Sequence, residues 1–379
     1  MPVHQFSFPT RIHFGAGARR LLPAHLASAG VRRPLVVTDR GVAALPLAGE
    51  LLAALSDVGL APALFGEVFG NPTAAQVAAS VAAFRQHEAD ALVGLGGGAA
   101  LDVAKAAALM VAHEGGILDY AWDHPRVRPV VSPLPRWVAV PTTSGTGSEV
   151  GRSAVISDDA THVKKVVFSP ALLATAVFAD PELTLGLPPK ITAATGMDAL
   201  THNIESYLSP VYHPLCDGIA LEGARLAARA LPAAVRHGSD LAARSDMMMS
   251  SMMGAIAFQK DLGAVHSCAH ALSAVCDLHH GLANALMLER VMRFNAEAVP
   301  EKLAELARVC GAGADAAQFV AWLGRLKAEV GLPARLADVG VKPAHLARLV
   351  EVAAADSCHR TNPRPCGPAD FERLFVAAL

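Results

Sequence analysis

The first half of the chain alternates short apolar runs with longer, alanine-rich amphipathic patterns. Such apolar runs predict buried strands, and the amphipathic patterns predict helices that connect one parallel strand to the next. Helices are expected at 47–59 and 74–89. The expected strands are PLVVTD at 34–39, ALVGLGGG at 91–98, RWVAVPTT at 136–143 and ATAVFADP at 174–181. The first half is therefore expected to form an α/β domain around a parallel, Rossmann-like sheet.

The pattern changes after GLPPK at 186–190. Strand-like runs almost vanish there, and amphipathic helical patterns continue to the C-terminus. Pro188 and Pro189 mark the expected boundary between an α/β domain over 1–187 and an all-α domain over 188–379. Because no repeat or low-complexity linker separates the two, we expect a fixed interface around a cleft.

Composition and charge narrow the class of protein. Hydrophobic residues make up 53% of the chain and aromatic residues only 5%, so the interior must be built mainly from Ala, Val and Leu. The net charge is -2, and no basic run is present that would neutralise a phosphate backbone, which argues against nucleic acid as a partner. No signal peptide, membrane span or C-x-x-C pair is recognisable. We therefore expect a soluble cytoplasmic enzyme with a small-molecule substrate.

Two polar turns follow predicted strands. The first is Gly96-Gly97-Gly98, which opens a helical pattern, and the second is PTTSGTGS at 141–148. Glycines let backbone N–H groups approach a diphosphate closely, and a helix N-terminus adds a favourable field for an anion. Two such turns on one sheet indicate an extended, phosphate-bearing cofactor.

Asp39 lies at the end of the first predicted strand. A carboxylate there is placed to accept hydrogen bonds from the 2′-hydroxyl of a ribose and to repel a 2′-phosphate. This position favours NAD over NADP.

Candidate metal ligands gather in the second half. Asp198 and His202 lie four residues apart, so a helix would present both on one face. Four of the 16 histidines fall within 15 residues of a small, apolar segment, namely His266, His270, His279 and His280. Buried histidines need polar partners, and one cation would satisfy several of them. Three imidazoles and one carboxylate would suit divalent iron or zinc and leave room for a substrate oxygen.

Taken together, four motifs resemble the iron-containing (group III) alcohol dehydrogenase family. They are GGGAALDVAK at 96–105, PTTSGTGSEV at 141–150, GMDALTHNIES at 196–206 and the histidine-rich segment 263–284. The similarity runs from about residue 5 to TNPRP at 361–365. It implies the fold of that family, which is also dehydroquinate synthase-like: an N-terminal NAD-binding domain, a C-terminal helical domain and a cleft that holds metal and nicotinamide.

The resemblance also implies roles for single residues. The family's metal ligands fall on Asp198, His202, His266 and His280, where His280 is preferred to His279 because it directly precedes a glycine. His270 matches a non-ligand position near the nicotinamide that is linked to proton transfer, so the expected catalytic residues are His270, Asp198 and His266. The cofactor positions fall on Asp39, Asn71, Gly97, Gly98, Asp102, Thr142, Thr143 and Thr146, with a lysine expected at 164 or 165, of which we choose Lys164.

Two positions depart from the family pattern. Ala99 stands where the family usually has a serine after the third glycine, so one hydroxyl contact to the cofactor is missing. The residues after His270 read Ala271-Leu272-Ser273, which changes a part of the family pattern near the substrate. Neither departure touches the expected metal ligands.

The resemblance implies a metal-dependent alcohol dehydrogenase, or aldehyde reductase, that transfers hydride between a small primary alcohol or diol and NAD. Fe(II) is the favoured metal and Zn(II) the alternative. Other readings stay open. A hydroxyacid dehydrogenase or transhydrogenase, acting on 4-hydroxybutyrate for example, would need a cation for the carboxylate, for which Lys260 is a candidate. A metal-independent reductase such as maleylacetate reductase would lack the metal. A lyase on the related dehydroquinate-synthase fold would make no net redox change.

A homodimer or larger homo-oligomer is the assembly that the resemblance suggests. The segment FSFPTRIHFGAG at 6–17 could pair across it as an edge strand.

Overall fold

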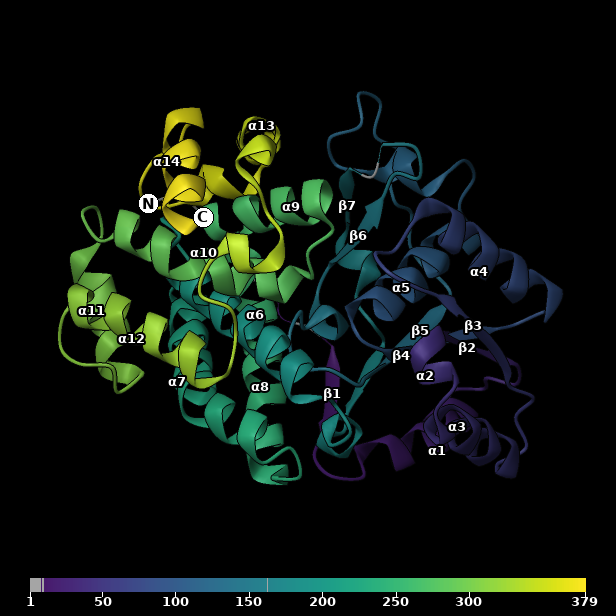
Figure 1. Cartoon of the computed structure of the whole chain (residues 1–379). Coiled ribbons are helices and arrows are strands. Elements are labelled where there is room, and N and C mark those ends of the chain that lie inside the picture. The colour runs from purple at the N-terminus through teal and green to yellow at the C-terminus, as the bar shows by residue number, and fades with distance from the viewer. Residues whose placement is uncertain (1–7, 9, 162) are drawn as a thin grey trace. The chain divides into compact units, whose positions relative to one another are not determined.

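The computed structural model describes residues 8, 10–161 and 163–379, which divide into two compact units (Figure 1). We call them the α/β unit, up to residue 143 and from 148 to 184, and the helical unit, with residues 144–147 and 185–379. The last change from one unit to the other, after residue 184, lies beside the Pro188–Pro189 boundary expected from the sequence. The segment 144–147 belongs to the helical unit because it packs there, so that a Cβ added to Gly147 would lie 2.4 Å from Ala255 Cβ.

A six-stranded parallel sheet forms the centre of the α/β unit, in the order β1-β8-β5-β4-β2-β3. Its strands are β1 (Arg11–Phe14), β2 (Pro34–Asp39), β3 (Ala63–Val68), β4 (Ala91–Gly96), β5 (Arg136–Pro141) and β8 (Ala176–Ala179). The chain passes from β2 to β3 on one side and then returns to β4 on the other side of β2. Ligands of such sheets bind at this reversal, beside the C-terminal ends of the strands.

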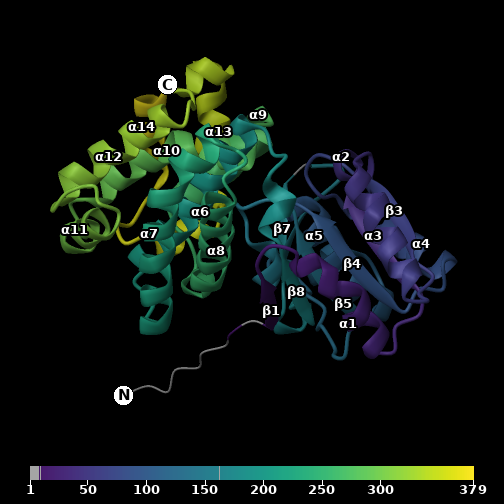
Figure 2. The same ribbon diagram turned by 90° about the horizontal axis from the view of Figure 1, so that it is seen from below.

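Helices cover both faces of this sheet (Figures 1 and 2). On one face lie α1 (Leu22–Ser28) and α3 (Pro46–Asp57), and on the other lie α4 (Ala74–Gln86) and α5 (Gly98–Ala112). Every residue of β4 is buried, as expected for a central parallel strand that is covered on both sides. The alanines of α5 leave it buried over most of its length, so it can lie directly against the sheet.

The strands missed by the sequence pattern are those that are exposed or short. The edge strand β1 has only exposed and half-buried residues, and the other edge strand, β3, mixes exposed, half-buried and buried residues, so neither is buried along its whole length. A separate antiparallel hairpin, β6 (Ser153–Ser157) and β7 (Lys164–Phe168), was also not predicted. Part of the expected edge segment 6–17 does form β1 at the edge of the sheet, whereas residues 6, 7 and 9 lie outside the described residues.

The helical unit contains no strand among its described residues. Its helices are α6 (Pro189–Leu208), α7 (Pro214–Arg236), α8 (Leu241–Ala257), α9 (Ala264–Cys276), α10 (His280–Asn295), α11 (Pro300–Val309), α12 (Ala316–Glu329), α13 (Leu346–Ala355) and α14 (Pro368–Ala378). They enclose one large core built mainly from Ala, Leu, Val and Met. The predicted fold class, a parallel α/β unit followed by an all-α unit, is confirmed.

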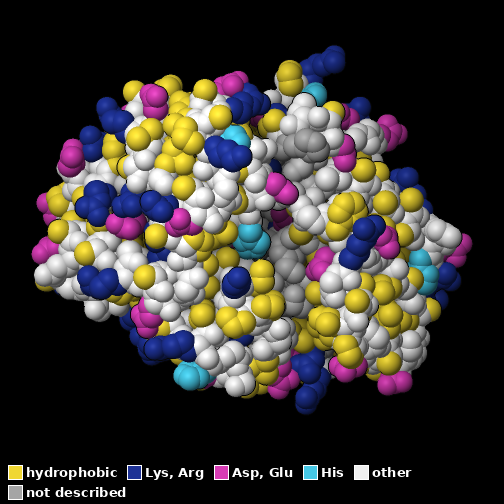
Figure 3. All heavy atoms as spheres, in the orientation of Figure 1, with side chains coloured by type: hydrophobic (Ala, Val, Ile, Leu, Met, Phe, Trp, Pro, Cys, Tyr) yellow, Lys and Arg dark blue, Asp and Glu magenta, His cyan; other side chains and the backbone are white. Residues whose placement is uncertain are grey.

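The surface matches the near-neutral charge. Figure 3 shows Lys and Arg side chains interspersed with Asp and Glu over the visible face. Across the described residues, no helix combines the length and apolar character needed to cross a bilayer.

Candidate active site

Helix α6 presents the first two predicted ligands. Both Asp198 and His202 are buried, and their spacing of four places them on one face of the helix. The opposite side of α6 packs closely on α7, since a Cβ added to Gly196 would lie 2.3 Å from Leu231 Cδ1. Glycine at this position therefore lets α6 pack directly against α7, and this packing fixes the positions of the polar residues on α6.

The other two ligands come from consecutive helices. His266 lies in the first turn of α9, and His280 is the first residue of α10. Between these helices, Asp277 takes a left-handed conformation with φ of 52°, which ends α9 and turns the chain back toward α6. Helix α10 approaches α6 closely, because a Cβ on Gly281 would lie 2.2 Å from the carbonyl oxygen of Ala194.

The four predicted ligands meet in one place. One ligand atom from each of Asp198, His202, His266 and His280 lies within 4.8 Å of all the others. Three of these atoms are imidazole Nε2 atoms that face Asp198 Oδ1, at 3.9 Å from His202, 3.9 Å from His266 and 3.5 Å from His280. Three imidazole nitrogens and one carboxylate oxygen are a donor set that suits iron or zinc, so the residues fit a divalent metal.

Burial keeps His202 in the form that binds metal. Desolvation lowers the pKa of His202 to about 4, although Asp198 opposes the shift. The imidazole is therefore neutral near pH 7, and a neutral imidazole is the metal-ligating form.

Glu205 contacts His266 at Nδ1, the ring nitrogen that does not face the other ligands. Its Oε2 lies 2.6 Å from His266 Nδ1, and its Oε1 accepts a hydrogen bond from the backbone N–H of Val265 at 2.7 Å. This leaves Nε2 of His266 directed toward the other ligands, the arrangement in which an outer carboxylate fixes the tautomer and raises the basicity of a ligand. Burial raises the pKa of Glu205 to about 7, while backbone N–H groups oppose the shift.

Asn284 supports the carboxylate. It lies one turn after His280 on α10, and its Nδ2 donates to Asp198 Oδ1 at 2.7 Å. The same nitrogen lies 3.4 Å from His266 Nε2 and 3.3 Å from His280 Nε2. The amide therefore contacts three of the four predicted ligands.

His270 lies one turn after His266 on α9 and is outside the ligand group. Its Nδ1 is 2.8 Å from Asp356 Oδ2, and its ring stacks on that of His280 with centroids 5.4 Å apart. Asp356 is held in turn by Ser267 Oγ at 2.7 Å and by the backbone N–H of Cys358 at 2.9 Å. A fixed carboxylate thus orients the imidazole beside the ligand group.

In the α/β unit, the predicted cofactor positions lie at the C-terminal ends of neighbouring strands. Asp39 ends β2, Asn71 follows β3, and Gly97 and Gly98 follow β4 at the start of α5. Thr142 and Thr143 follow β5. They therefore border the reversal between β2 and β4, where a dinucleotide is expected in this class of sheet.

Asp39 and Gly96 are close neighbours across that reversal. Asp39 Oδ1 accepts from the backbone N–H of Val42 at 2.9 Å and so caps the short helix α2 (Arg40–Ala43). Gly96 has φ of 145°, and a Cβ there would lie 2.8 Å from Ala100 Cβ and 3.1 Å from Asp39 Oδ2. Only glycine fits at this turn, which keeps the backbone open beside the carboxylate.

Asp102 has a different environment from the other cofactor positions. It is buried in α5, and both its oxygens already accept hydrogen bonds, from Ser148 Oγ at 2.5 Å and from the backbone N–H of Val155 at 2.9 Å. Lys105, one turn further on, donates to Ser148 O and to Ser153 O. This geometry favours an indirect role for Asp102, holding the chain after β5 in place, over the direct cofactor contact predicted from the sequence.

The two remaining cofactor positions lie elsewhere. Thr146 belongs to the segment 144–147 of the helical unit, and Lys164 begins β7. The neighbouring Lys165, the other lysine considered, binds Asp123 at 2.7 Å. The cofactor contacts of Thr146 and Lys164 stay predictions.

Lys260, the cation proposed for a substrate carboxylate, is buried in the 3-10 helix η6 (Phe258–Lys260). Its Nζ binds the Asp217 carboxylate and lies 3.4 Å from the carbonyl oxygen of Tyr207. Its charge is therefore already paired on α7, and the suggestion that it receives a substrate carboxylate is wrong.

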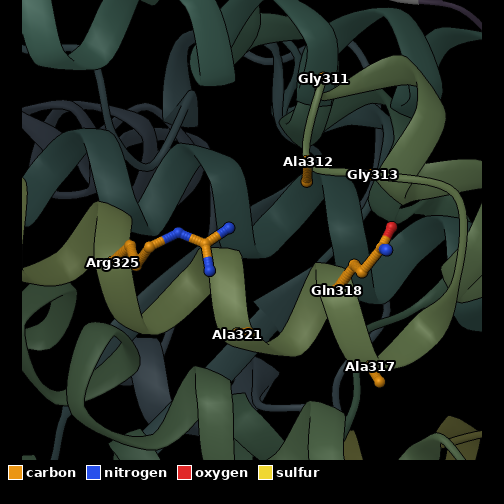
Figure 4. Close-up of a pocket in the computed structure, with 7 residues that line it drawn as sticks. All are labelled: Gly311, Ala312, Gly313, Ala317, Gln318, Ala321 and Arg325. Carbon is orange, nitrogen blue, oxygen red and sulfur yellow. The ribbon is translucent and has the colours of Figure 1, made fainter.

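An open surface groove occurs on the helical unit, beside the turn between α11 and α12 (Figure 4). It is lined by Gly311, Ala312, Gly313, Ala317, Gln318, Ala321 and Arg325. None of the predicted site residues contributes to it, so it is separate from the ligand group.

The sheet with its glycine turns, together with the three-histidine and one-carboxylate group, defines the class of metal- and nicotinamide-dependent alcohol oxidoreductases. The family model for iron-containing alcohol dehydrogenases matches residues 9–181, and the model for the C-terminal domain of the Fe-containing family matches residues 192–379. The chain belongs to the iron-containing alcohol dehydrogenase family.

Individual proteins are similar to this chain over nearly its whole length. The chain is 42% identical to 4-hydroxybutyrate dehydrogenase of Cupriavidus necator over 385 residues, which cover 98% of each protein. It is 37% identical to 1,3-propanediol dehydrogenase of Klebsiella pneumoniae, covering 100% of this chain and 99% of that one. The solved structure of a 1,3-propanediol oxidoreductase matches with a TM-score of 0.95 at 35% identity and covers 100% of both chains. The protein is thus an NAD-dependent alcohol oxidoreductase that uses a divalent metal.

Proposed function

We propose that Asp198, His202, His266 and His280 bind the catalytic divalent metal and that the substrate is a small primary alcohol or diol. The convergence of four ligand atoms within 4.8 Å is the observation that carries this proposal. The family favours Fe(II), with Zn(II) as the alternative. When bound, such a metal acts as a Lewis acid on the alcohol hydroxyl, and the nicotinamide accepts the hydride.

The protein's own groups orient the reactants and move the proton. Glu205 and Asn284 fix the ligands, as their contacts with His266 and Asp198 indicate. His270, turned by Asp356 and stacked on His280, is the group that we assign to proton exchange with solvent. The ligand group is largely buried and His270 is partly exposed, so this imidazole gives the proton a route to solvent.

Replacing His270 by glutamine should lower kcat by about 10²-fold, at the lower end of the range for general acid–base catalysis. Glutamine keeps a polar side chain but has no ring nitrogen that exchanges a proton near neutral pH. Steady-state kinetics with a saturating alcohol, together with metal content, would check this. Full metal occupancy with unchanged kcat would show that another group carries the proton.

Replacing Asp39 by asparagine should lower the preference for NAD over NADP, measured as the ratio of kcat/KM values, by at least about tenfold, because like charges placed together cost several kcal/mol. The amide still accepts from Val42, so the cap of α2 is retained and the change isolates the charge. An unchanged ratio would place the ribose elsewhere.

A second candidate substrate is 4-hydroxybutyrate, which is favoured by the 42% identical relative of that name. Since Lys260 is paired with Asp217, a carboxylate would have to meet another cation, which an uncharged alcohol or diol does not need. We would reconstitute the metal-free protein with Fe(II) or Zn(II) and measure NAD reduction with 1,3-propanediol, 1-propanol and 4-hydroxybutyrate. A kcat/KM for 4-hydroxybutyrate above that of both alcohols would reverse the order of the two candidates.

The homodimer and the cytoplasmic location stay predictions from the sequence. Size-exclusion chromatography with light scattering would test the first of them.

A further inference from the structure

A second cluster of metal-binding side chains lies beside the ligand group and shares no residue with it. One ligand atom from each of His270, Asp356 and Cys358 lies within 4.8 Å of the other two. His270 comes from α9, whereas Asp356 and Cys358 come from the end of α13 and the start of the 3-10 helix η9 (Cys358–Thr361). All three are partly exposed, with side-chain exposures of 16% for His270 and 19% for Asp356, so ions from solvent can reach them.

We propose that these three residues form a second metal site that takes a thiophilic divalent ion, with Zn²⁺ as its natural occupant. A thiolate, an imidazole nitrogen and a carboxylate oxygen are the ligands zinc prefers, and a water would complete a tetrahedral shell. Asp356 is already positioned, since Ser267 Oγ donates to its Oδ1 at 2.7 Å. The thiol separates this site chemically from the catalytic ligand group, which contains no sulfur.

Binding exchanges a proton for the cation. His270 Nδ1 faces Asp356 Oδ2 at 2.8 Å and carries a hydrogen toward it. When an ion binds Nδ1, this ring proton moves to Nε2 and the imidazole stays neutral, whereas the S–H proton of Cys358 is lost to form the thiolate, so one proton passes to solvent for each ion bound. The carboxylate then serves the cation instead of accepting from the imidazole.

Occupancy of this second site should inhibit the enzyme. An imidazole held through Nδ1 by a cation is fixed and is a weaker base, so His270 can no longer exchange protons with the substrate. This inhibition rests on the proposed role of His270, whereas the binding itself does not.

The test uses the iron-loaded enzyme, titrated with Cd²⁺ as a spectroscopic probe and separately with Zn²⁺. We expect a thiolate-to-metal charge-transfer band that saturates at about one Cd²⁺ per chain, proton release in weakly buffered solution, and inhibition by Zn²⁺ while the iron content stays constant. Cys358→Ser should abolish the band and raise the Zn²⁺ concentration for half inhibition by at least about tenfold. Cys310→Ser, at a cysteine outside both clusters, should leave the band and the inhibition unchanged.

Two results would overturn the second site, and a third would overturn only the proposed role of His270. A missing band, or one that persists in Cys358→Ser, would show that the three residues form a hydrogen-bond network only. Zinc inhibition accompanied by loss of iron and no band would locate zinc in the catalytic ligand group, which also overturns the second site. A band that depends on Cys358 without any inhibition would confirm the site but remove proton exchange from His270, a failure of the proposed function alone.

Discussion

Replacing His280 by alanine is expected to strip the protein of its catalytic metal and to lower kcat for alcohol oxidation by at least about 10³-fold. The metal contributes several kcal/mol of charge stabilisation in the transition state, and each 1.36 kcal/mol corresponds to a factor of ten in rate. His280 Nε2 lies 3.5 Å from Asp198 Oδ1, so its loss opens one side of the four-ligand group. Metal content after dialysis, measured by mass spectrometry, and kcat on the same sample would check both parts.

The neighbouring histidine provides a matched control. His279 is exposed and precedes α10, and it is not among the four residues whose ligand atoms converge. His279→Ala should therefore keep metal and activity near the wild-type values. If His279→Ala lost the metal and His280→Ala kept it, the assignment of the fourth ligand would be reversed.

A variant with a smaller expected effect distinguishes the metal ligands from a residue that only supports a ligand. Glu205→Gln keeps the size of the side chain but removes the anion that faces His266 Nδ1. Metal affinity should fall by about 10- to 100-fold, the usual effect of losing an outer-shell partner, rather than vanish. Competition with a chelator of known affinity measures this difference, and an unchanged affinity would mean that Glu205 supports only the backbone of α9.

The parts of the site that could be predicted are those whose residues lie close together in the sequence. Asp198 and His202 share a face of one helix, so a spacing of four was sufficient to place them together. The same rule was available for Asn284, four residues after His280, and for Glu205, seven after Asp198, but neither was selected, because an amide or a glutamate on a helix has many ordinary roles. Asp356 is 86 residues from His270, and no sequence pattern joins them.

The incorrect or weakened predictions have a physical cause as well. Lys260 stands close to His266 in sequence, yet its side chain turns toward Asp217 on α7, and sequence proximity carries no information on that direction. Asp102 follows the glycine turn by four residues, which places it inside the unit against β6 rather than at the turn itself. The central strands were predicted because burial on both faces leaves an apolar run, whereas β1 and β3 lack one.

The close approach of α10 to α6 leads to a second large effect, in Gly281→Ala. The added Cβ would lie 2.2 Å from the carbonyl oxygen of Ala194 and 2.7 Å from its carbonyl carbon, which are backbone atoms of α6 that no side-chain rotation can move. The helices must separate, and His280 moves away from Asp198 with them. Since metal–ligand distances tolerate only about 0.2 Å, we expect metal affinity to fall by at least about 10²-fold and stability by about 3 kcal/mol.

Urea unfolding with and without metal, combined with chelator competition, distinguishes the two consequences of this change. The metal-free protein should lose stability through the clash alone, and the metal-loaded protein should lose more, because binding to the folded state then contributes less. Gly218→Ala on α7, where an added Cβ meets nothing within 4 Å, is the matched control: it should leave the metal affinity unchanged and raise the stability by about 0.5–1 kcal/mol, because alanine favours a helix over glycine. A wild-type metal affinity in Gly281→Ala would show that the spacing of α6 and α10 does not set the ligand geometry. The fourth ligand would then have to come from a part of the chain that moves independently of α10.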